Sequence, residues 1–548
     1  MIKLARIFSD GIVLQRNMPI VIWGESDFDS QLTVKINNEA VGKFTIQNGQ
    51  FFLTIPPQKE MENATVQIGD IVLENVDFGE VWLAVGQSNM EFEYEFASDK
   101  EPAAANDEHL RMYTVGRYSF EGERELKDKE WEPWDKWYTA TNNNEQKFSA
   151  VGYAYAKKLR EGGVPIGIIN SSWGGTSASA WIYRKLMEKD SELKAYIDDF
   201  ETFKESLNLD VFKKLKMSMR ANNTNPVIEM ANKAGMLQNT THPIEFMKRF
   251  DENGDGMSAL PKELFKENAK RPSDINKIFA WGPCNPNEPG ALYDHMVQEF
   301  MGYSVKGVIY YQGESDEHRA TVYDKLFSTL INSWRADWLS QNAAQTRLPF
   351  IFTQLAPFGI WGFSNGNEYT VLREKQEKVE AELDDVYMAS ISDVGNVFDI
   401  HPKEKMIVGN RLALLAEKNV YNKVVAADAP KGVKVIVNRE KGKLEMKFDN
   451  VTDLYLKEQS DAEYNGFAVD TIMPEFLPCV LGGVNGLEVI ADGTAVKLAL
   501  CEVENDVLVV KSRELVGVND IKVKFARTAF YQVNLYNEGG IPAIPFEV

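Results

Sequence analysis

The stretch VWLAVGQSNM (Val81–Met90) decides the fold, because five mostly apolar residues lead directly into Gly86, Gln87, Ser88 and Asn89. An apolar run of this length, followed by polar residues, is typical of a buried strand that ends at the glycine. In open α/β sheets, ligands bind outside the carboxyl ends of the strands. A serine at that position, with backbone N–H groups and a helix start beside it, is a candidate nucleophile. The alternative is that Ser88 only caps the helix.

Strands and helices alternate from this stretch to about residue 420. We expect strands at 81–85, 164–170, 305–313, 348–355 and 386–391, and helices at 148–159, 323–338, 372–383 and 404–418. Such alternation predicts an α/β domain with a parallel sheet and helices on both faces.

The regions on either side of this domain have a different pattern. Residues 1–78 contain alternating, β-rich runs such as LTVKIN (32–37), and predict an N-terminal β-sandwich domain. Residues 421–548 again read as strands and turns and predict a C-terminal β domain. The predicted α/β domain, 79–420, is interrupted by a helical insertion at 186–285 that is rich in Lys, Glu, Asn and Met.

The bulk composition excludes some functions. The chain has 548 residues, 44% hydrophobic and 26% charged, with a formal net charge of −21. An acidic surface repels phosphate backbones and anionic lipids, so we expect no nucleic-acid or membrane partner. Three cysteines without CxxC spacing imply no complete disulfide framework. The N-terminus lacks the layout of a secretory signal. Two expectations are compatible with this: a secreted or periplasmic protein whose leader is absent from this chain, or a cytoplasmic protein.

A nucleophilic serine needs a base, which is usually histidine. The chain has five histidines, and His401 lies at the matching place, after the predicted strand VYMASI and before a helix. His318, which follows the strand bearing Gln312, is the second candidate. The chain lacks the Gly-x-Ser-x-Gly elbow of α/β-hydrolases because position 90 is Met.

An oxyanion needs donors beyond the N–H of Ser88. Gly174 and Gly175 follow the predicted strand VPIGIIN, and glycines allow the backbone to approach a ligand closely. Gln312 follows a third strand and brings a side-chain amide that can donate. Either feature alone could be an ordinary turn or loop contact. Their shared position at the carboxyl ends of one predicted sheet favours the catalytic interpretation.

Four motifs in this order, GQSNM (86–90), WGGT (173–176), YYQGESD (310–316) and DIHP (399–402), resemble the blocks of SGNH-type serine esterases. More narrowly, they resemble the sialate O-acetylesterase family. The resemblance covers most of the chain except the 186–285 insertion. It implies a three-layer α/β/α hydrolase domain flanked by β domains, and removal of O-acetyl groups from sugars without a metal or organic cofactor.

The resemblance also implies roles for residues. Ser88 would be the nucleophile and His401 the general base. The N–H of Ser88, a backbone N–H at Gly174 or Gly175, and the Gln312 side chain would bind the oxyanion. By nearness in sequence to these motifs, Asn89, Trp173 and Glu314 are the candidates for sugar contact.

The group that orients His401 stays open. The wider SGNH pattern has aspartate three residues before the histidine, where this chain has Phe398. Asp399, two residues before it, is the favoured third member of a triad. Glu314, Asp393 or a backbone carbonyl are the alternatives.

The substrate also stays open. Sialic acid and an acetylated plant polysaccharide such as xylan are both expected substrates of a carbohydrate O-acetylesterase. A non-catalytic carbohydrate-binding protein on the same fold is the competing hypothesis, although a pure binder has no need for Ser88 and His401. A lipase or thioesterase would require a long apolar pocket. The oligomeric state cannot be predicted.

The insertion contains an EF-hand-like loop at 251–263. Three side chains occupy positions one, three and five, Gly256 occupies the turn position, and the backbone carbonyl at position seven would complete the set. Position twelve is Lys262, with a glutamate one residue late. The predicted ligands of a structural calcium ion are Asp251, Asn253, Asp255, Met257 and Glu263. The alternative is a solvated acidic turn.

Overall fold

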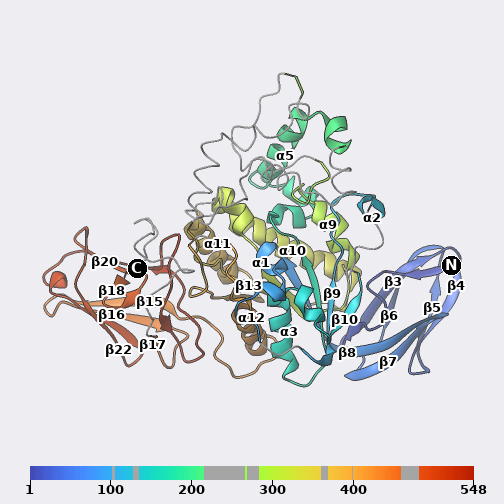
Figure 1. The fold of residues 1–548 in the computed structure, drawn as a ribbon, viewed down its shortest axis with the longest axis horizontal. Coiled ribbons are helices and arrows are strands. Elements are labelled where there is room, and N and C mark those ends of the chain that lie inside the picture. The colour runs from blue at the N-terminus through green and yellow to red at the C-terminus, as the bar shows by residue number, and fades with distance from the viewer. Residues whose placement is uncertain are drawn as a thin grey trace. The chain divides into compact units, whose positions relative to one another are not determined.

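A computed structural model describes residues 1–101, 105–126, 135–214, 266–267, 283–359, 368–397, 399–457 and 480–548. Figure 1 shows the order of the elements along the chain. The chain divides into two compact units. The first consists of residues 1–95, 101–318 and 322–350, and the second of residues 96–100, 319–321 and 351–548.

The N-terminal part of the first unit consists of strands. β3 (Ile20–Ser26) pairs antiparallel with both β1 (Ile2–Leu4) and β6 (Gly49–Ile55). β4 (Ser30–Ile36) pairs with β5 (Glu39–Ile46) and β7 (Met61–Ile68). Inward and outward residues alternate along β6, as expected for strands with one buried face. The β content predicted for residues 1–78 is confirmed, whereas the sandwich arrangement stays a prediction.

β8 (Ile71–Gly86) is a single strand of 16 residues. Its first part pairs antiparallel with β7, and Asp77–Gly79 pairs in parallel with β2 (Val13–Gln15). From Glu80 onward it pairs in parallel with β11 (Ile166–Ser172), and its last five residues also pair with β12 (Gly307–Tyr311). The predicted strand 81–85 is therefore the last third of a strand that begins in the N-terminal β region.

β8 is an inner strand of the sheet that carries the site. In the first unit the strand order is β10 (Trp137–Ala140), β9 (Asp107–Thr114), β11, β8 and β12. β9, β11, β8 and β12 run in parallel, and β10 pairs antiparallel with β9. Parallel strands of this type are buried on both faces, and β11 and β12 are buried at every position.

Helices pack on both faces of this sheet. Tyr155 of α3 (Ala150–Arg160) contacts Trp82 of β8, with ring centroids 5.2 Å apart. Phe327 of α10 (Tyr323–Gln341) stacks on Tyr310 of β12 at 4.8 Å. Tyr310 is the register partner of Val85, which lies on the opposite face of β8 from Trp82. The two helices therefore cover opposite faces, as the alternation predicted.

Short helices fill the connections. They are α1 (Ser88–Glu91), η1 (Tyr94–Phe96), α2 (Glu123–Leu126), η2 (Asn144–Lys147), η3 (Ala178–Trp181), α4 (Arg184–Met187), α5 (Lys194–Ser206), α9 (Ala291–His295), η6 (Val297–Glu299) and η7 (Glu314–Val322). Of the predicted insertion 186–285, only 186–214, 266–267 and 283–285 are described, and α5 is helical as expected.

The second unit begins with the last α/β elements. β13 (Phe350–Thr353) and β14 (Val386–Ala389) precede and follow α11 (Tyr369–Glu382), and α12 (Lys405–Asn419) comes last. Arg373 of α11 is buried and donates to the carbonyl oxygens of Thr528 and Ala529 at 3.2 and 2.7 Å. This arginine therefore fixes α11 to the C-terminal β region.

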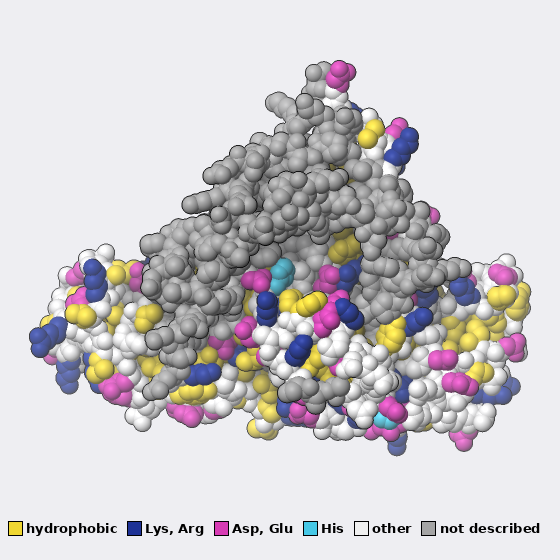
Figure 2. All heavy atoms as spheres, viewed as in Figure 1, with side chains coloured by type: hydrophobic (Ala, Val, Ile, Leu, Met, Phe, Trp, Pro, Cys, Tyr) yellow, Lys and Arg dark blue, Asp and Glu magenta, His cyan; other side chains and the backbone are white. Residues whose placement is uncertain are grey.

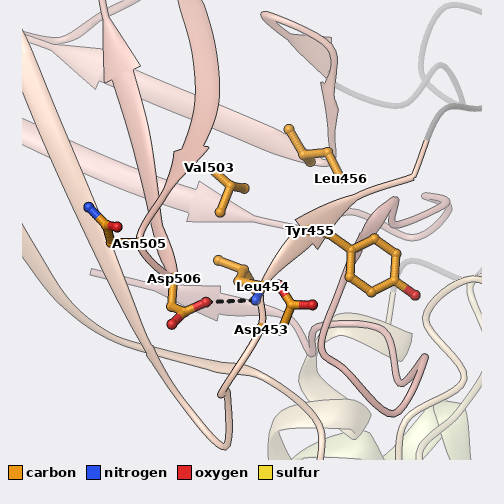
Figure 3. A pocket seen from close by; sticks show the side chains of 7 residues that line it. All are labelled: Asp453, Leu454, Tyr455, Leu456, Val503, Asn505 and Asp506. Carbon is orange, nitrogen blue, oxygen red and sulfur yellow. Dashed lines mark hydrogen bonds between the residues drawn. The ribbon is translucent and has the colours of Figure 1, made fainter.

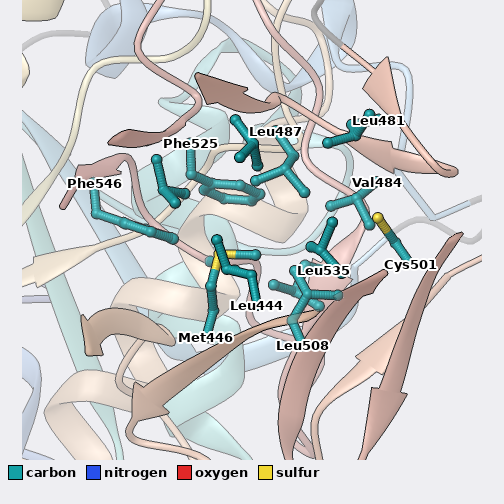
Figure 4. Packing of buried hydrophobic residues seen from close by; sticks show 14 of the residues in the cluster. Leu444, Met446, Leu481, Val484, Leu487, Cys501, Leu508, Phe525, Leu535 and Phe546 are labelled. Carbon is teal, nitrogen blue, oxygen red and sulfur yellow. The ribbon is translucent and has the colours of Figure 1, made fainter. Parts of the chain in front are cut away.

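The C-terminal β region has two four-stranded sheets. One has the order β15 (Lys431–Asn438), β16 (Lys443–Asp449), β23 (Val507–Lys511), β22 (Leu500–Glu504), and the other β21 (Thr494–Ala495), β20 (Leu487–Ala491), β24 (Ile521–Phe525), β26 (Phe546–Glu547). Figure 4 shows the apolar cluster that the sheets share, including Leu444, Leu508 and Phe525. The remaining short pairs are β17 (Tyr455–Leu456) with β25 (Leu535–Tyr536), and β18 (Val480–Leu481) with β19 (Val484–Asn485).

The surface of the protein carries many charged side chains, as the composition of the sequence indicates. Figure 2 shows acidic and basic side chains interspersed on the face in view. Among the residues that the structure describes, no helix is both long and apolar enough to cross a bilayer. The three-domain division predicted from the sequence stays a prediction.

Candidate active site

Three of the predicted loops leave the sheet at the same carboxyl edge. Gly86, the last residue of β8, is the register partner of Ser172 in β11 and of Tyr311 in β12. Trp173 donates its N–H to the Gly86 carbonyl at 3.1 Å, and Gln87 donates its N–H to the Tyr311 carbonyl at 3.1 Å. The loops that begin at residues 87, 173 and 312 are therefore adjacent in space.

Ser88 stands directly after the end of β8. Gly86 has φ +152°, and a Cβ on it would lie 2.0 Å from the carbonyl oxygen of Tyr311. Only glycine allows this strand-to-helix turn so close to β12. Ser88 is the first residue of α1, is partly exposed, and follows Gln87, which holds the N-cap position without a side-chain hydrogen bond. The alternative that Ser88 caps the helix is therefore wrong.

Gly174 lies against Ser88. A Cβ on Gly174 would be 3.2 Å from the Cβ of Ser88 and 3.1 Å from Oε2 of Glu91. The N–H of Gly174, a predicted oxyanion donor, donates to Oε2 of Glu91. The other oxygen of that carboxylate forms a 2.7 Å ion pair with Nη1 of Arg117. Neither charged residue was among the predicted site residues.

The rest of the loop after β11 is held by Asn287. Its amide nitrogen donates to the Gly175 carbonyl at 2.7 Å, and its oxygen accepts from the Ser177 N–H at 2.9 Å. Gly175 is exposed with φ +71°, and its N–H has no acceptor among the residues that the structure describes. Asn287 follows the predicted insertion, so nothing in the sequence pattern linked it to this loop.

Gln312 is buried and its amide nitrogen has two protein acceptors. It donates to the Thr176 carbonyl at 3.1 Å and to Oδ2 of Asp316 at 2.5 Å. Asp316, fully buried, also accepts from the Ser177 hydroxyl at 2.6 Å and from the Ala178 N–H at 2.9 Å. This carboxylate therefore ties the QGES segment to the loop after β11. The part of Gln312 in binding an oxyanion stays a prediction.

The three predicted sugar-contact residues lie in the same loops. The amide of Asn89 donates to Oε1 of Glu314 at 2.5 Å, and both residues are buried. Trp173 is partly exposed, and its carbonyl accepts from the Thr176 hydroxyl at 2.7 Å. Burial raises the pKa of the Tyr311 hydroxyl, and the carboxylate of Glu314 raises it further.

His401 and Asp399 belong to the second unit. Nδ1 of His401 lies 3.5 Å from Oδ1 of Asp399, which also accepts from the His401 N–H at 2.9 Å. Burial alone would raise the pKa of Asp399, but the hydrogen bonds from His401 outweigh it, so the pKa is lowered. The carboxylate is therefore ionised beside the imidazole, and its role as the group that orients His401 stays a prediction.

The alternative residues have other partners. Asp393 forms a two-pronged ion pair with Arg411, at 2.6 and 2.7 Å, and accepts from the Tyr536 hydroxyl at 3.1 Å. His318, the second candidate base, is exposed in η7, and its ring centroid lies 6.2 Å from that of Tyr196. Within the second unit, Asp399 is thus the carboxylate beside His401.

The loop that bears His401 is anchored to residues 96–100. The Ser98 N–H donates to the Lys403 carbonyl at 2.9 Å. The two carboxylate oxygens of Asp99 accept from the N–H groups of Met406 and Ile407, at 3.1 and 3.0 Å, at the start of α12. A segment that follows Ser88 by about ten positions is therefore bonded to the His401 loop.

The predicted calcium ligands 251–263 lie outside the described residues. Within the described ranges, no three His, Cys, Asp or Glu side chains are grouped so that they could hold a metal ion. A hollow of about 400 Å³ in the C-terminal β region is lined by residues 453–456, 503 and 505–506, whose side chains Figure 3 shows. None of the predicted site residues lines it.

Comparisons with known proteins point to one class of enzyme. A family model described as carbohydrate esterase, sialic acid-specific acetylesterase, matches residues 273–415. The sialate O-acetylesterase of Rattus norvegicus is 24% identical over 483 residues, covering 80% of this chain and 78% of the rat protein. The Mus musculus enzyme is 23% identical over 426 residues, covering 73% of this chain but 66% of the mouse protein.

One solved structure is similar over the whole chain. It is the crystal structure of a carbohydrate acetylesterase from Xanthomonas citri, with TM-score 0.66 and 26% identity, covering 100% of this chain and 99% of that one. The chain thus has the α/β esterase fold with additional β sheets and is a carboxylic ester hydrolase. More narrowly, the predicted resemblance to the sialate O-acetylesterase family is confirmed.

Proposed function

We propose that this chain is a serine esterase that removes O-acetyl groups from carbohydrate through an acetyl-enzyme intermediate. The observation that carries the proposal is the register of β8, β11 and β12, which brings Ser88, the Gly174–Gly175 loop and the QGES segment to one edge of the sheet. The confirmed family resemblance supplies the ester class.

In the proposed mechanism, His401 accepts the proton of the Ser88 hydroxyl while the serine oxygen attacks the acetyl carbonyl. The tetrahedral intermediate collapses when His401 gives this proton to the departing sugar oxygen, which leaves as the sugar hydroxyl. A water molecule, deprotonated by the same imidazole, then attacks the acetyl-enzyme and releases acetate. Asp399 holds the imidazole in the tautomer that this sequence requires.

The oxyanion would be bound by backbone N–H groups next to the nucleophile. Ser88 and the Gly174–Gly175 loop are the predicted donors. The Gln312 amide is the third, and its nitrogen would have to release Thr176 or Asp316 to bind the oxyanion. Because the N–H of Gly174 is occupied by Glu91, the N–H of Gly175, which has no acceptor among the described residues, is the more available of the two glycines. One such donor contributes about 3 kcal/mol of barrier lowering in comparable sites.

His401 and Ser88 must meet for this chemistry. Acyl transfer by serine and histidine needs no metal or organic cofactor, so we propose none for catalysis. A structural calcium ion at 251–263 is a separate proposal. It is tested by titrating calcium into protein that has been treated with a chelator and then dialysed. The absence of both a binding heat and a change in melting temperature would contradict it.

The proposed partner is an O-acetylated carbohydrate, with acetylated sialic acid or an acetylated xylan-type polysaccharide as the substrate. The proposed location of the enzyme is secreted or periplasmic. A non-catalytic carbohydrate-binding role remains the second candidate. The relatives that are sialate O-acetylesterases and the Xanthomonas citri carbohydrate acetylesterase support the carbohydrate class.

The test is acetate release from p-nitrophenyl acetate, acetylated sialic acid and acetylated xylo-oligosaccharides. Wild type should release acetate, whereas Ser88→Ala and His401→Ala should lose at least about a thousandfold in kcat/KM. Ser340→Ala is the matched control, because this exposed serine at the end of α10 only donates to the Asp337 carbonyl. Equal rates for wild type and Ser88→Ala would overturn the proposal.

A further inference from the structure

A carboxylate already fills a binding site beside the candidate nucleophile. Oε2 of Glu91 accepts the Gly174 N–H, and Oε1 lies 2.7 Å from Nη1 of Arg117. Gly174 in turn faces Ser88, because a Cβ placed on the glycine would lie 3.2 Å from the Cβ of Ser88. One cation and one backbone N–H therefore hold a carboxylate next to the residue that would attack the ester.

The site is formed by loops at the same sheet edge. β9 pairs in parallel with β11, with Thr114 opposite Asn170, and Arg117 follows three residues after β9 ends. The Val115 N–H donates to the Asn170 carbonyl at 2.9 Å, which continues this register into the loop. Glu91 is the last residue of α1, three positions after Ser88. The binding groups come from different strands, so the site depends on the fold and not on one local turn.

A ligand can reach this pair. The side chains of Arg117 and Glu91 retain 22% and 25% of their full exposure. A guanidinium and a backbone N–H together form charge-assisted hydrogen bonds with any carboxylate of suitable shape. Two carboxylates cannot share these donors, because like charges at hydrogen-bonding distance repel each other.

The neighbouring cation in the described chain is also paired. Lys147 contacts both Glu93 and Glu95, which follow α1. The segment that follows Ser88 is therefore acidic, with glutamates at 91, 93 and 95.

We propose that Glu91 fills, with its own carboxylate, an anion-binding site made by Arg117 and the Gly174 N–H, and so selects substrates that are neutral near the acetyl group. This inference rests on the proposed esterase function and deepens it. Glu91 is a specificity-determining residue: an acetylated neutral sugar is accepted, whereas a sugar that carries a carboxylate close to the ester must displace Glu91 first. Removal of Glu91 exposes the site to external carboxylates.

The binding test uses acetate itself as the probe and needs no turnover. Isothermal titration of acetate into Ser88→Ala/Glu91→Ala and into Ser88→Ala alone should show tighter binding, by at least about tenfold, where Glu91 is absent. Arg117→Ala in addition should remove the gain. Glu91→Gln keeps the shape of the side chain without its charge and should give an intermediate affinity, which covers the case that Glu91→Ala does not fold.

The activity test uses a pair of substrates that differ only in charge, sialic acid acetylated at O4, on the ring that carries the C1 carboxylate, and its C1 carboxamide. Wild type should deacetylate the carboxamide faster, and Glu91→Ala should raise the acid-to-carboxamide ratio of kcat/KM by about tenfold. An unchanged ratio together with unchanged acetate binding overturns the inference, as does a wild type that prefers the acid. Failure of the esterase function itself is distinguishable, because neither substrate nor p-nitrophenyl acetate would then release acetate in a Ser88-dependent way.

Discussion

Gly86 lies against the backbone of Tyr311 so closely that a methyl group on the glycine would be 2.0 Å from the Tyr311 carbonyl oxygen. The same glycine has φ +152°, which residues with a side chain rarely adopt. This contact brings the start of the Ser88 loop against β12, so the position of the candidate nucleophile depends on the absence of one Cβ.

Gly86→Ala should therefore destabilise the protein severely, by more than about 3 kcal/mol, because the clash is with backbone and cannot be relieved by a rotamer change. Gly163→Ala is the matched control: it also has positive φ, +85°, but nothing lies within 4 Å of its Cβ position. That variant should lose only about 1 kcal/mol. Denaturant unfolding measures both, and equal losses would contradict the clash argument.

Gly174→Ala should impair turnover more than folding. Its Cβ would be 3.1 Å from Glu91 Oε2 and 3.2 Å from Ser88 Cβ, so the loop must move by a few tenths of an ångström away from the nucleophile. We expect kcat/KM for p-nitrophenyl acetate to fall at least about tenfold, with a small change in Tm. Full activity in this variant would show that the loop does not need its present distance from Ser88.

Asp316→Asn should lower stability, because an amide cannot accept all three hydrogen bonds from Ser177, Ala178 and Gln312. Leaving buried donors unsatisfied costs about 2–4 kcal/mol in total. Asp198→Asn, at an exposed position of α5, is the control and should change stability by less than about 0.5 kcal/mol. Urea unfolding compares the two; similar midpoints would mean that the buried carboxylate is not needed for the loop.

Asp399→Asn should reduce kcat at least about a hundredfold, since an amide at this position favours the wrong imidazole tautomer. Asp393→Asn serves as the comparison, because it breaks the ion pair with Arg411 and should lower Tm with little effect on kcat. Initial rates across a pH range measure both. Near-normal turnover by Asp399→Asn would remove it from the triad and leave a serine-histidine dyad.

Two glutamates of α11 predict a pH-dependent stability. Burial raises the pKa of Glu377 and Glu380 to about 7, from 4.5, against the lowering effect of Lys431. Between about pH 4.5 and 7 the folded state then binds more protons than the unfolded one, so the free energy of unfolding falls as pH rises. These groups stabilise fully below that window, and the contribution is lost above pH 7.

Glu377→Gln and Glu380→Gln should therefore flatten the change in Tm between pH 5 and pH 8 relative to wild type. Glu382→Gln, at the exposed end of the same helix, is the control and should leave the profile unchanged. Differential scanning calorimetry measures the three profiles. If both Glu377→Gln and Glu380→Gln showed the same change in Tm with pH as wild type, the raised pKa values of these glutamates would be contradicted.

Much of the fold followed from periodicity. The helices at 148–159, 323–338, 372–383 and 404–418 correspond to α3, α10, α11 and α12, and the apolar runs around 164–170 and 305–313 correspond to β11 and β12. Long amphipathic helices and buried strands have strong patterns that single residues do not obscure. Their carboxyl ends also located the loops of the candidate site.

The elements that the sequence did not predict have weak or non-local signals. β9 begins with charged residues (DEHLRMYT) and β10 has only four residues, so the loop that brings Arg117 was missed. Asp316 and Asn287 form their contacts with residues more than a hundred positions away, and no spacing rule relates such pairs. Glu91 lies in the same motif region as Ser88, but its ion-pair partner Arg117 is distant in the sequence.

One continuous strand, β8, pairs with β7 in its first half and with β11 and β12 in its second. The residues that pin the opening β region and those that carry the GQSN turn thus share a single uninterrupted backbone. Residues 1–70 are consequently not an independent domain that can be removed, because their deletion would take away the strands that pair with the first half of β8. A shortened protein that keeps the esterase sheet would therefore need to retain these residues.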